Sequence, residues 1–476
     1  MADGQPLPRL SAAEAAARLG VKPETLYAYV SRGLLTRERT AAGSTFDPLE
    51  VEGFARRRRP SRPAAPQDGR MPAGTPLMVL DTDVAVIEDG ELYYRGRPAA
   101  VLATEADLEA VAAWLWSGVD PGTAAPVAGV VGDDDARAVR HLVAALPSSA
   151  TLLDRIQAAV TGLAATDPLR HDTDAESLRR VGARLLTGVP RALAGAVARP
   201  VPAAVGRLGD VLAAGPGGDA VVGGGGGRHA GTGGPSVTTG AGPAAATGRG
   251  PRGGTGGGSD VGGGTARTGV AATLWRALST AAPTPEGVHA LSAALVLTVD
   301  HDLAVSTLAA RVAASARASG YAVVTAALGA FDSALHGNAS RAAAGLLARV
   351  LAGERVEAAL AAVVRDGRGV PGFGHPLYTG MDARARALLP LVAALPEGGR
   401  VLAAVEAVAA EVARRAGLHP NLDLALAALV LAAGMSHEAG TAVFAVGRTV
   451  GWIAHALAEH EERPLRLRPR GRYTGP

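Results

Sequence analysis

The sequence predicts a mostly α-helical protein that carries a small N-terminal domain and a glycine-rich insertion. Apolar residues recur at a period near 3.6 from residue 136 to residue 197, as they do on one face of a helix. From Val270 to the C-terminus, further helical segments are separated by Gly and Pro. Between them, residues 215–269 contain 24 of the 63 glycines and no Leu, Ile, Met, Phe, Tyr or Trp. This segment cannot bury enough apolar surface to fold, so we expect a disordered insertion between two helical parts.

Composition excludes several classes of site. The chain has no Cys, which removes disulfides, thiolate nucleophiles and Cys-based metal sites. Lys22 is the only lysine, so a Walker A loop and a Schiff-base lysine beyond residue 22 are excluded. No apolar run approaches twenty residues without a charge or a glycine. We therefore expect a soluble protein of the cytoplasm with no membrane partner.

The first 62 residues show the signals of a small helical domain. Ser11 and Glu14 form a capping box before an alanine-rich helix. Pro23 opens a second helix that runs to Arg32, and Asp47 caps a third helix after a short hairpin-like segment. Eleven basic and seven acidic side chains give this part a net charge of +4, which leaves −1 for the rest of a chain whose total is +3.

Residues 10–58 resemble a winged helix-turn-helix of the MerR type. The matching runs are A-A-R-L-G-V before the recognition helix and R-G-L-L after it. The resemblance implies DNA binding, with phosphate contacts from Arg32, Arg37 and Arg39. The family's Arg-Tyr-Tyr run is Tyr27-Ala28-Tyr29 here, so an accessory domain without an operator is the alternative.

The next expected element is a β-hairpin followed by a helix. Val84, Val86 and Leu92 alternate around Asp89-Gly90, a favoured two-residue turn. The pattern after the hairpin predicts a helix over 105–118.

Three histidines lie at expected helix ends, where a ring can face a cleft. His301 precedes a helix expected over 306–316, and His336 lies between two helices rich in small residues. His375 lies in a Gly-Phe-Gly turn, where bare backbone can approach a ligand closely. Arg384 follows nine residues later at a helix start, and its guanidinium suits a carboxylated ligand.

The candidate base is Asp423, at the start of an apolar helix over 422–435 that Asn421 caps. The helix dipole is expected to hold this carboxylate ionised, as a base requires. His455 and His460 are five residues apart and lack the i,i+4 spacing of metal ligands. We therefore expect no metal site.

Seven motifs occur in a fixed order between residues 91 and 475. They are E-L-Y-Y-R-G (91–96), V-D-H-D (299–302), A-L-H-G-N-A (334–339), P-G-F-G-H-P-L-Y (371–378), N-L-D (421–423), G-R-T-V-G-W-I-A-H (447–455) and L-R-P-R-G-R-Y-T-G (467–475). With the insertion left out, this order resembles the citrate synthase family. The resemblance implies a helical homodimer in which a large and a small domain close on the substrates. It also implies acetyl-CoA as a co-substrate and no permanently bound cofactor.

The resemblance assigns roles to matching positions. Asp423 would take a proton from the methyl group of acetyl-CoA, and His336 would stabilise the resulting enol. His375 would polarise and protonate the carbonyl group of oxaloacetate. The dicarboxylate would be held by His301, Arg384, Arg448 and Arg468 of the partner subunit.

The expected domain boundaries follow from these assignments: a winged helix-turn-helix at 1–58, a linker at 59–75, the large domain at 76–200, the disordered insertion at 201–270, the catalytic core of the large domain at 271–337, the small domain at 338–432 and the C-terminal part of the large domain at 433–476.

The sequence departs from the family pattern at some positions, and two alternative functions stay open. Asn338 replaces a glycine of the usual L-H-G-G-A run, and the D-A-R motif lacks its proline. One alternative is 2-methylcitrate synthase, which uses propionyl-CoA, because one methylene changes binding by only about 1–3 kcal/mol. The other is a DNA-binding regulator whose synthase-like part senses a ligand.

Overall fold

The computed structural model describes residues 9–40, 43–57, 79–118, 131–194, 269–333, 336–365, 369–469, 473 and 475. The expected linker at 59–75 and nearly all of the expected insertion at 201–270 lie outside these residues. Within the described residues the fold is mostly helical, with eighteen α-helices and two small antiparallel sheets. The predicted fold class, a mostly helical protein, is therefore confirmed.

The N-terminal unit combines three helices with a three-stranded antiparallel sheet in the order β1-β3-β2. Its elements are β1 (Leu10–Ser11), α1 (Ala12–Leu19), α2 (Pro23–Ser31), β2 (Arg37–Thr40), β3 (Gly43–Phe46) and α3 (Pro48–Arg57). The predicted capping box is present, since Ser11 Oγ accepts from the amide of Glu14 and the Glu14 carboxylate accepts from the amide of Ser11. A separate apolar core, which includes Leu26 and Phe46, holds this unit together.

The second sheet and five helices follow: β4 (Ala85–Glu88), β5 (Glu91–Tyr94), β6 (Arg97–Pro98), α4 (Ala99–Glu105), α5 (Leu108–Ser117), α6 (Asp133–Ala144), α7 (Leu152–Ala165) and α8 (Ala175–Leu193). The hairpin around Asp89-Gly90 is confirmed, but Val86 is half-exposed because β4 begins only at Ala85 and turns Val86 outward. The predicted helix over 105–118 begins too early. The helical structure is interrupted between α4 and α5, where the Asp107 carboxylate caps α5 by accepting a hydrogen bond from the amide of Ala110.

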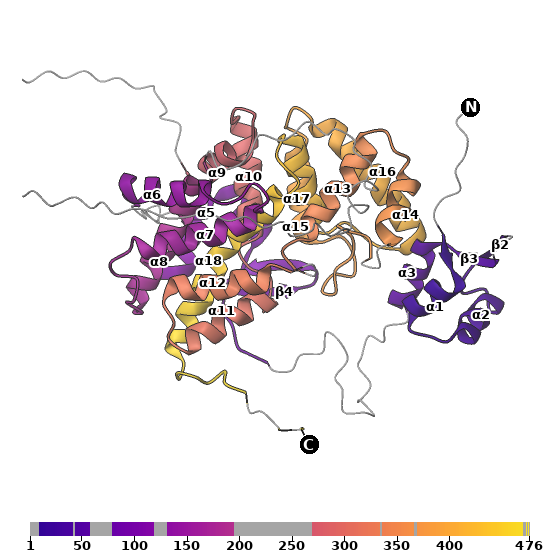
Figure 1. Cartoon of the computed structure of the whole chain (residues 1–476), viewed down its shortest axis with the longest axis horizontal. Coiled ribbons are helices and arrows are strands. Elements are labelled where there is room, and N and C mark those ends of the chain that lie inside the picture. Colours follow the sequence, from indigo (N-terminus) through magenta and orange to yellow (C-terminus); the bar gives the residue numbers. More distant parts are fainter. Residues whose placement is uncertain are drawn as a thin grey trace, which may run out of the picture. The chain divides into compact units, whose positions relative to one another are not determined.

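Ten more helices complete the described chain: α9 (Val270–Leu278), α10 (Pro285–Leu297), α11 (Val305–Ser315), α12 (Gly320–Phe331), α13 (Ala339–Leu351), α14 (Val356–Arg365), α15 (Ala383–Val392), α16 (Gly398–Ala416), α17 (Leu422–Ala432) and α18 (Ala439–Glu461). Helices α13 to α17 form one group, in which α13 and α16 pack against α17 (Figure 1).

Helix α18 is the central element of the large core. It packs against α5, α7, α8, α10, α11 and α12 and also touches α13 and α17 (Figure 1). Among the described helices it alone is long and apolar enough to cross a membrane, and 89% of its most apolar window is buried inside the protein. Its residues therefore face neighbouring helices on nearly every side, and any polar side chain on it must find a partner inside the core.

Candidate active site

Two loops far apart in the sequence are joined by backbone hydrogen bonds. The amide of Gly374 donates to the carbonyl of His419 at 2.8 Å, and the amide of Asn421 donates to the carbonyl of Gly372 at 2.9 Å. The Asn421 side chain donates to the carbonyl of Gly374 at 3.0 Å and also caps α17. Gly372 has a positive φ of 82°, and an added Cβ would press on Leu424. These bonds bring the His375 loop to the first turn of α17, which carries Asp423.

His301 and His375 meet edge to face, with ring centroids 4.8 Å apart. The Nε2 atom of His301 lies 2.9 Å from the hydroxyl oxygen of Tyr378, three residues beyond His375. Burial, with help from the charge of Arg384, lowers the pKa of His301 well below its ordinary value and that of His375 to about 4. Both rings are therefore neutral at pH 7.

The local hydrogen bond of His375 decides which ring nitrogen carries its proton. The amide of Leu377 donates to Nδ1 of His375 at 3.2 Å, so Nδ1 is an acceptor. In a neutral ring the proton then lies on Nε2. His375 can therefore donate a hydrogen bond from Nε2 to a carbonyl oxygen.

Arg384 is fixed by Asp382, two residues earlier at the start of α15. Its Nε and Nη2 atoms donate to the two carboxylate oxygens at 3.0 and 2.7 Å, and both side chains are almost completely buried. Asp382 also accepts from the amide of Leu422 at the start of α17. Burial alone raises the pKa of Asp382, but Arg384 outweighs this effect and holds the pKa below its ordinary value. Both side chains are therefore charged, and their hydrogen bonds fix the orientation of the Arg384 guanidinium.

A hydrogen bond with the Ser306 hydroxyl holds the His336 ring in place. The Ser306 hydroxyl lies 2.7 Å from Nε2 of His336, and the same oxygen accepts from the indole N–H of Trp452 at 3.2 Å. Because the indole uses one lone pair of the oxygen, the hydroxyl hydrogen is available for His336. Burial, with Arg448 nearby, lowers the pKa of His336 to about 4, so this ring is neutral at pH 7 as well.

Asp423 is half-buried, and the Oδ1 atom of its carboxyl group is buried with no hydrogen-bond partner among the described residues. Burial raises its pKa to about 6, although Arg384 acts in the opposite direction. The first-turn position of Asp423 favours the ionised form, but burial is the largest cause of the shift and moves the pKa upward. A carboxylate with a raised pKa is a stronger base than an exposed one, and at pH 7 it is still mostly ionised.

The predicted site residues fall into three groups. His301, His336, His375, Arg384, Arg448 and Asp423 are linked by contacts and mutual electrostatic effects. Arg468 is separate from them, since it is exposed in the segment after α18. The predicted phosphate-contacting residues lie in the N-terminal unit, with Arg32 and Arg39 exposed and Arg37 5.7 Å from the ring of Tyr27. Among the described residues, no three His, Asp or Glu side chains are placed to hold a metal ion.

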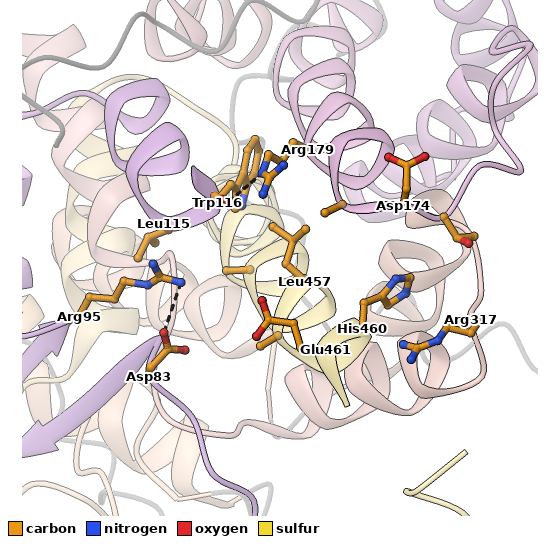
Figure 2. Close-up of a pocket in the computed structure, with 14 residues that line it drawn as sticks. Asp83, Arg95, Leu115, Trp116, Asp174, Arg179, Arg317, Leu457, His460 and Glu461 are labelled. Atoms are coloured by element: carbon orange, nitrogen blue, oxygen red, sulfur yellow. Dashed lines mark hydrogen bonds and ion pairs between the residues drawn. The ribbon is translucent and has the colours of Figure 1, made fainter. Parts of the chain in front are cut away.

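A cavity of about 610 Å³ lies elsewhere, around the C-terminal end of α18 (Figure 2). It contains none of the predicted site residues. Two of its arginines already have partners in the protein: Arg95 pairs with Asp83 at 3.4 Å, and Arg179 donates to the carbonyl of Trp116 at 2.8 Å. The volume of this cavity is therefore not evidence that it is the active site.

Sequence reasoning missed the residues that hold the site residues in place. Asp382, Ser306 and Tyr378 contact Arg384, His336 and His301, respectively. Asp382 could have been found, because an acid two residues before an arginine at a helix start can cap the helix and pair with the arginine. No local sequence signal pairs Ser306 with His336, thirty residues away.

The sequence and fold of this chain resemble those of known proteins. The family model described as "Citrate synthase, C-terminal domain" matches residues 73–470. The chain is 33% identical over 214 residues to "Citrate synthase 2" of Bacillus subtilis, which covers 44% of this chain and 56% of that protein. It is 30% identical over 191 residues to "2-methylcitrate synthase" of Mycobacterium tuberculosis, which covers 40% of this chain and 48% of that protein. The matched part thus spans about half the length of these relatives.

A solved structure supports the fold. Citrate synthase from Thermoplasma acidophilum, in a ternary complex with carboxymethyl coenzyme A and oxaloacetate, superposes with a TM-score of 0.59 at 22% identity. The superposition covers 84% of this chain and 94% of that one. Since the family model also spans most of the sequence, this chain belongs to the citrate synthase family.

Proposed function

We propose that this protein condenses acetyl-CoA with oxaloacetate and releases citrate and CoA. The observation that carries the proposal is Asp423, whose buried Oδ1 atom has no partner among the described residues and whose carboxyl group lies within electrostatic range of Arg384. A thioester α-hydrogen is a very weak acid, so its removal needs a base together with stabilisation of the enolate oxygen. The site supplies both kinds of group.

Proton transfers would follow the positions of these groups. Asp423 takes a proton from the acetyl methyl group, while His336 donates a hydrogen bond to the thioester oxygen. The methyl carbon then attacks the ketone carbon of oxaloacetate, and His375 gives its Nε2 proton to the oxygen of that ketone as the bond forms. The proton that Asp423 gained is released to solvent and the His375 ring takes one up, so both groups return to their starting states. Water cleaves the thioester to give citrate and free CoA. A preplaced donor at the developing oxygen charge contributes on the order of 3 kcal/mol.

The dicarboxylate would be bound by His301, Arg384 and Arg448. Arginine suits this role because its planar fork can donate two hydrogen bonds to one carboxylate. We further propose a homodimer in which Arg468 of the partner subunit completes the site. The supporting observation is that Arg468 is exposed and lies in the segment after α18, apart from the other site residues described.

Release of free CoA thiol from acetyl-CoA plus oxaloacetate tests the proposal, with wild type compared to Asp423→Asn. We expect activity in the wild type and a loss of at least about 100-fold in the variant. Equal activity in both proteins would contradict the mechanism. Propionyl-CoA, tested in parallel, decides between citrate and 2-methylcitrate synthesis, and no turnover with either donor would favour a ligand-sensing role.

We also propose that residues 9–57 are a winged helix-turn-helix that binds nucleic acid. The supporting features are two consecutive helices, α1 and α2, followed by the β2–β3 hairpin, with Arg32 and Arg39 exposed. The test is retention of the full chain on heparin and on DNA columns. We expect weaker retention after Arg32, Arg37 and Arg39 are changed to Ala or after residues 1–60 are deleted, whereas unchanged retention would contradict DNA binding.

A further inference from the structure

Helix α18 carries Arg448 and His455 seven residues apart, and this spacing places them on one face of the helix. Two glycines let this face approach the end of α10 closely. A Cβ at Gly447 would collide with the carbonyl of Leu295, and a Cβ at Gly451 would collide with the carbonyl of Val299. Polar groups of α18 therefore reach the segment that leads to His301.

Three buried side chains interact at this crossing. The Nε2 atom of His455 lies 2.9 Å from one carboxylate oxygen of Asp300. The other oxygen lies 3.5 Å from Nη1 of Arg448, whose Nε donates to the carbonyl of Thr298 at 2.9 Å. The side chains of Asp300, Arg448 and His455 are each at most 1% exposed.

The pair of Asp300 and Arg448 is incompletely formed. Neither Oδ1 of Asp300 nor Nη1 of Arg448 has a hydrogen-bond partner among the described residues. In contrast, Arg384 and Asp382 form two short hydrogen bonds in an equally buried position. Buried guanidinium and carboxylate groups normally close to about 2.8 Å, because that distance offsets the cost of removing both charges from water. The other carboxylate oxygen of Asp300 is held by the hydrogen bond from His455, and this bond restrains the carboxylate from turning toward Arg448.

We propose that His455 is a positioning residue that holds Asp300 back from Arg448, so that the end of the guanidinium stays available for a carboxylate group of the substrate. The inference rests on the proposed function. Asp300 directly precedes His301, so the hydrogen bond from His455 to Asp300 also helps to fix the position of His301, another residue of the proposed dicarboxylate site. The hydroxyl of Tyr94, which donates to the carbonyls of Val296 and Asp300 at 3.0 and 3.3 Å, anchors this segment from the other side.

The test compares His455→Leu with His455→Gln in the full chain. In the leucine variant Asp300 can close on Arg448 and compete with the substrate, so we expect the KM for oxaloacetate to rise about 10- to 100-fold. We expect the KM for acetyl-CoA to stay within about twofold of wild type. Glutamine can place an amide N–H near the position of Nε2, so His455→Gln should restore the KM for oxaloacetate to within about threefold.

A matched control removes a buried interaction elsewhere. Asp167 is 3% exposed and accepts from Arg180 and Tyr321, far from these groups in the sequence. Asp167→Asn should lower the melting temperature and leave both KM values unchanged. If His455→Leu does not fold, His455→Asn takes its place, because its shorter amide cannot reach Asp300.

Calorimetric titration with oxaloacetate separates this inference from the proposed function. A wild type that binds oxaloacetate but forms no citrate would overturn the proposed function alone. Equal oxaloacetate affinity in wild type and His455→Leu, or glutamine no better than leucine, would overturn the inference alone. Equal rises in both KM values would also overturn it, because they would indicate a general structural effect.

Discussion

Asp382 and Arg384 form a two-point ion pair inside the protein, with hydrogen bonds of 3.0 and 2.7 Å between residues that are at most 4% exposed. The same carboxylate accepts from the backbone at the start of α17. One acid therefore sets both the direction of the guanidinium and the position of the helix that carries Asp423. Removing the charge of Asp382 should disturb substrate binding and stability together.

We predict that Asp382→Asn raises the KM for oxaloacetate at least tenfold and destabilises the protein by about 3–5 kcal/mol, because it leaves a buried charge without its partner. Steady-state kinetics and urea unfolding measure the two effects. Glu354→Gln is the matched control, since Glu354 and Arg349 form the same two-point pair at the surface. That pair is partly exposed and should contribute only about 0–1 kcal/mol. Similar effects from both substitutions would show that the Asp382 pair has no special role.

Ser306→Ala should lower kcat about 10- to 100-fold and leave the KM for oxaloacetate nearly unchanged. The variant removes the hydroxyl group that fixes the His336 ring, so the ring can adopt the wrong tautomer or orientation. Ser315→Ala is the control on the same helix, because the Ser315 hydroxyl is buried and has no partner among the described residues. Equal kcat values for the two variants would contradict a role for Ser306 in positioning His336.

Much of the fold could be predicted from local signals, and the reason is physical. The capping box at Ser11 and the N-cap at Asn421 depend on bonds within a few residues, so the sequence contains the whole interaction. The break between α4 and α5 was missed because the helix pattern continues through it and only Asp107 marks it. Partners such as Ser306 for His336 depend on how distant helices pack, which no local pattern encodes.

The directions of pKa shifts at the site were the hardest to predict, for the same reason. The first-turn position of Asp423 is visible in the sequence and favours its charged form. The burial of its carboxyl group depends on α13, α15 and α16, which pack around α17 and are distant in sequence or separated from it by loops. Desolvation is the largest cause of the shift, so the raised pKa follows from the tertiary packing.

Asp423→Asn should stabilise the protein while it removes activity. The folded pKa of about 6 lies above the ordinary value of 3.8, so ionisation at pH 8 costs the folded state on the order of 3 kcal/mol. Below about pH 4 the group is protonated in both the folded and the unfolded state, and the cost disappears. We therefore predict that the variant is more stable than wild type at pH 8 and that the two converge as the pH falls through 6 toward 4.

Urea unfolding of both proteins across this pH range measures the difference in free energy of unfolding. Titration of the buried histidines affects wild type and variant alike, so the difference isolates Asp423. A variant that is less stable than wild type at pH 8 would show that the Asp423 carboxylate has a stabilising partner and is not a desolvated base.

The pH dependence of turnover should identify the base directly. Asp423 must be ionised to take a proton, so kcat/KM for acetyl-CoA should fall about tenfold per pH unit below a midpoint near 6, at saturating oxaloacetate. His336 and His375, with pKa values of about 4, stay neutral between pH 5.5 and 8 and should add no inflection in that range. A midpoint near 6.5 to 7 that persists in the residual activity of Asp423→Asn would assign the essential ionisation to a histidine. Loss of that inflection in the variant, with the histidines unchanged, would place it on Asp423, where burial in the first turn of α17 has raised the pKa.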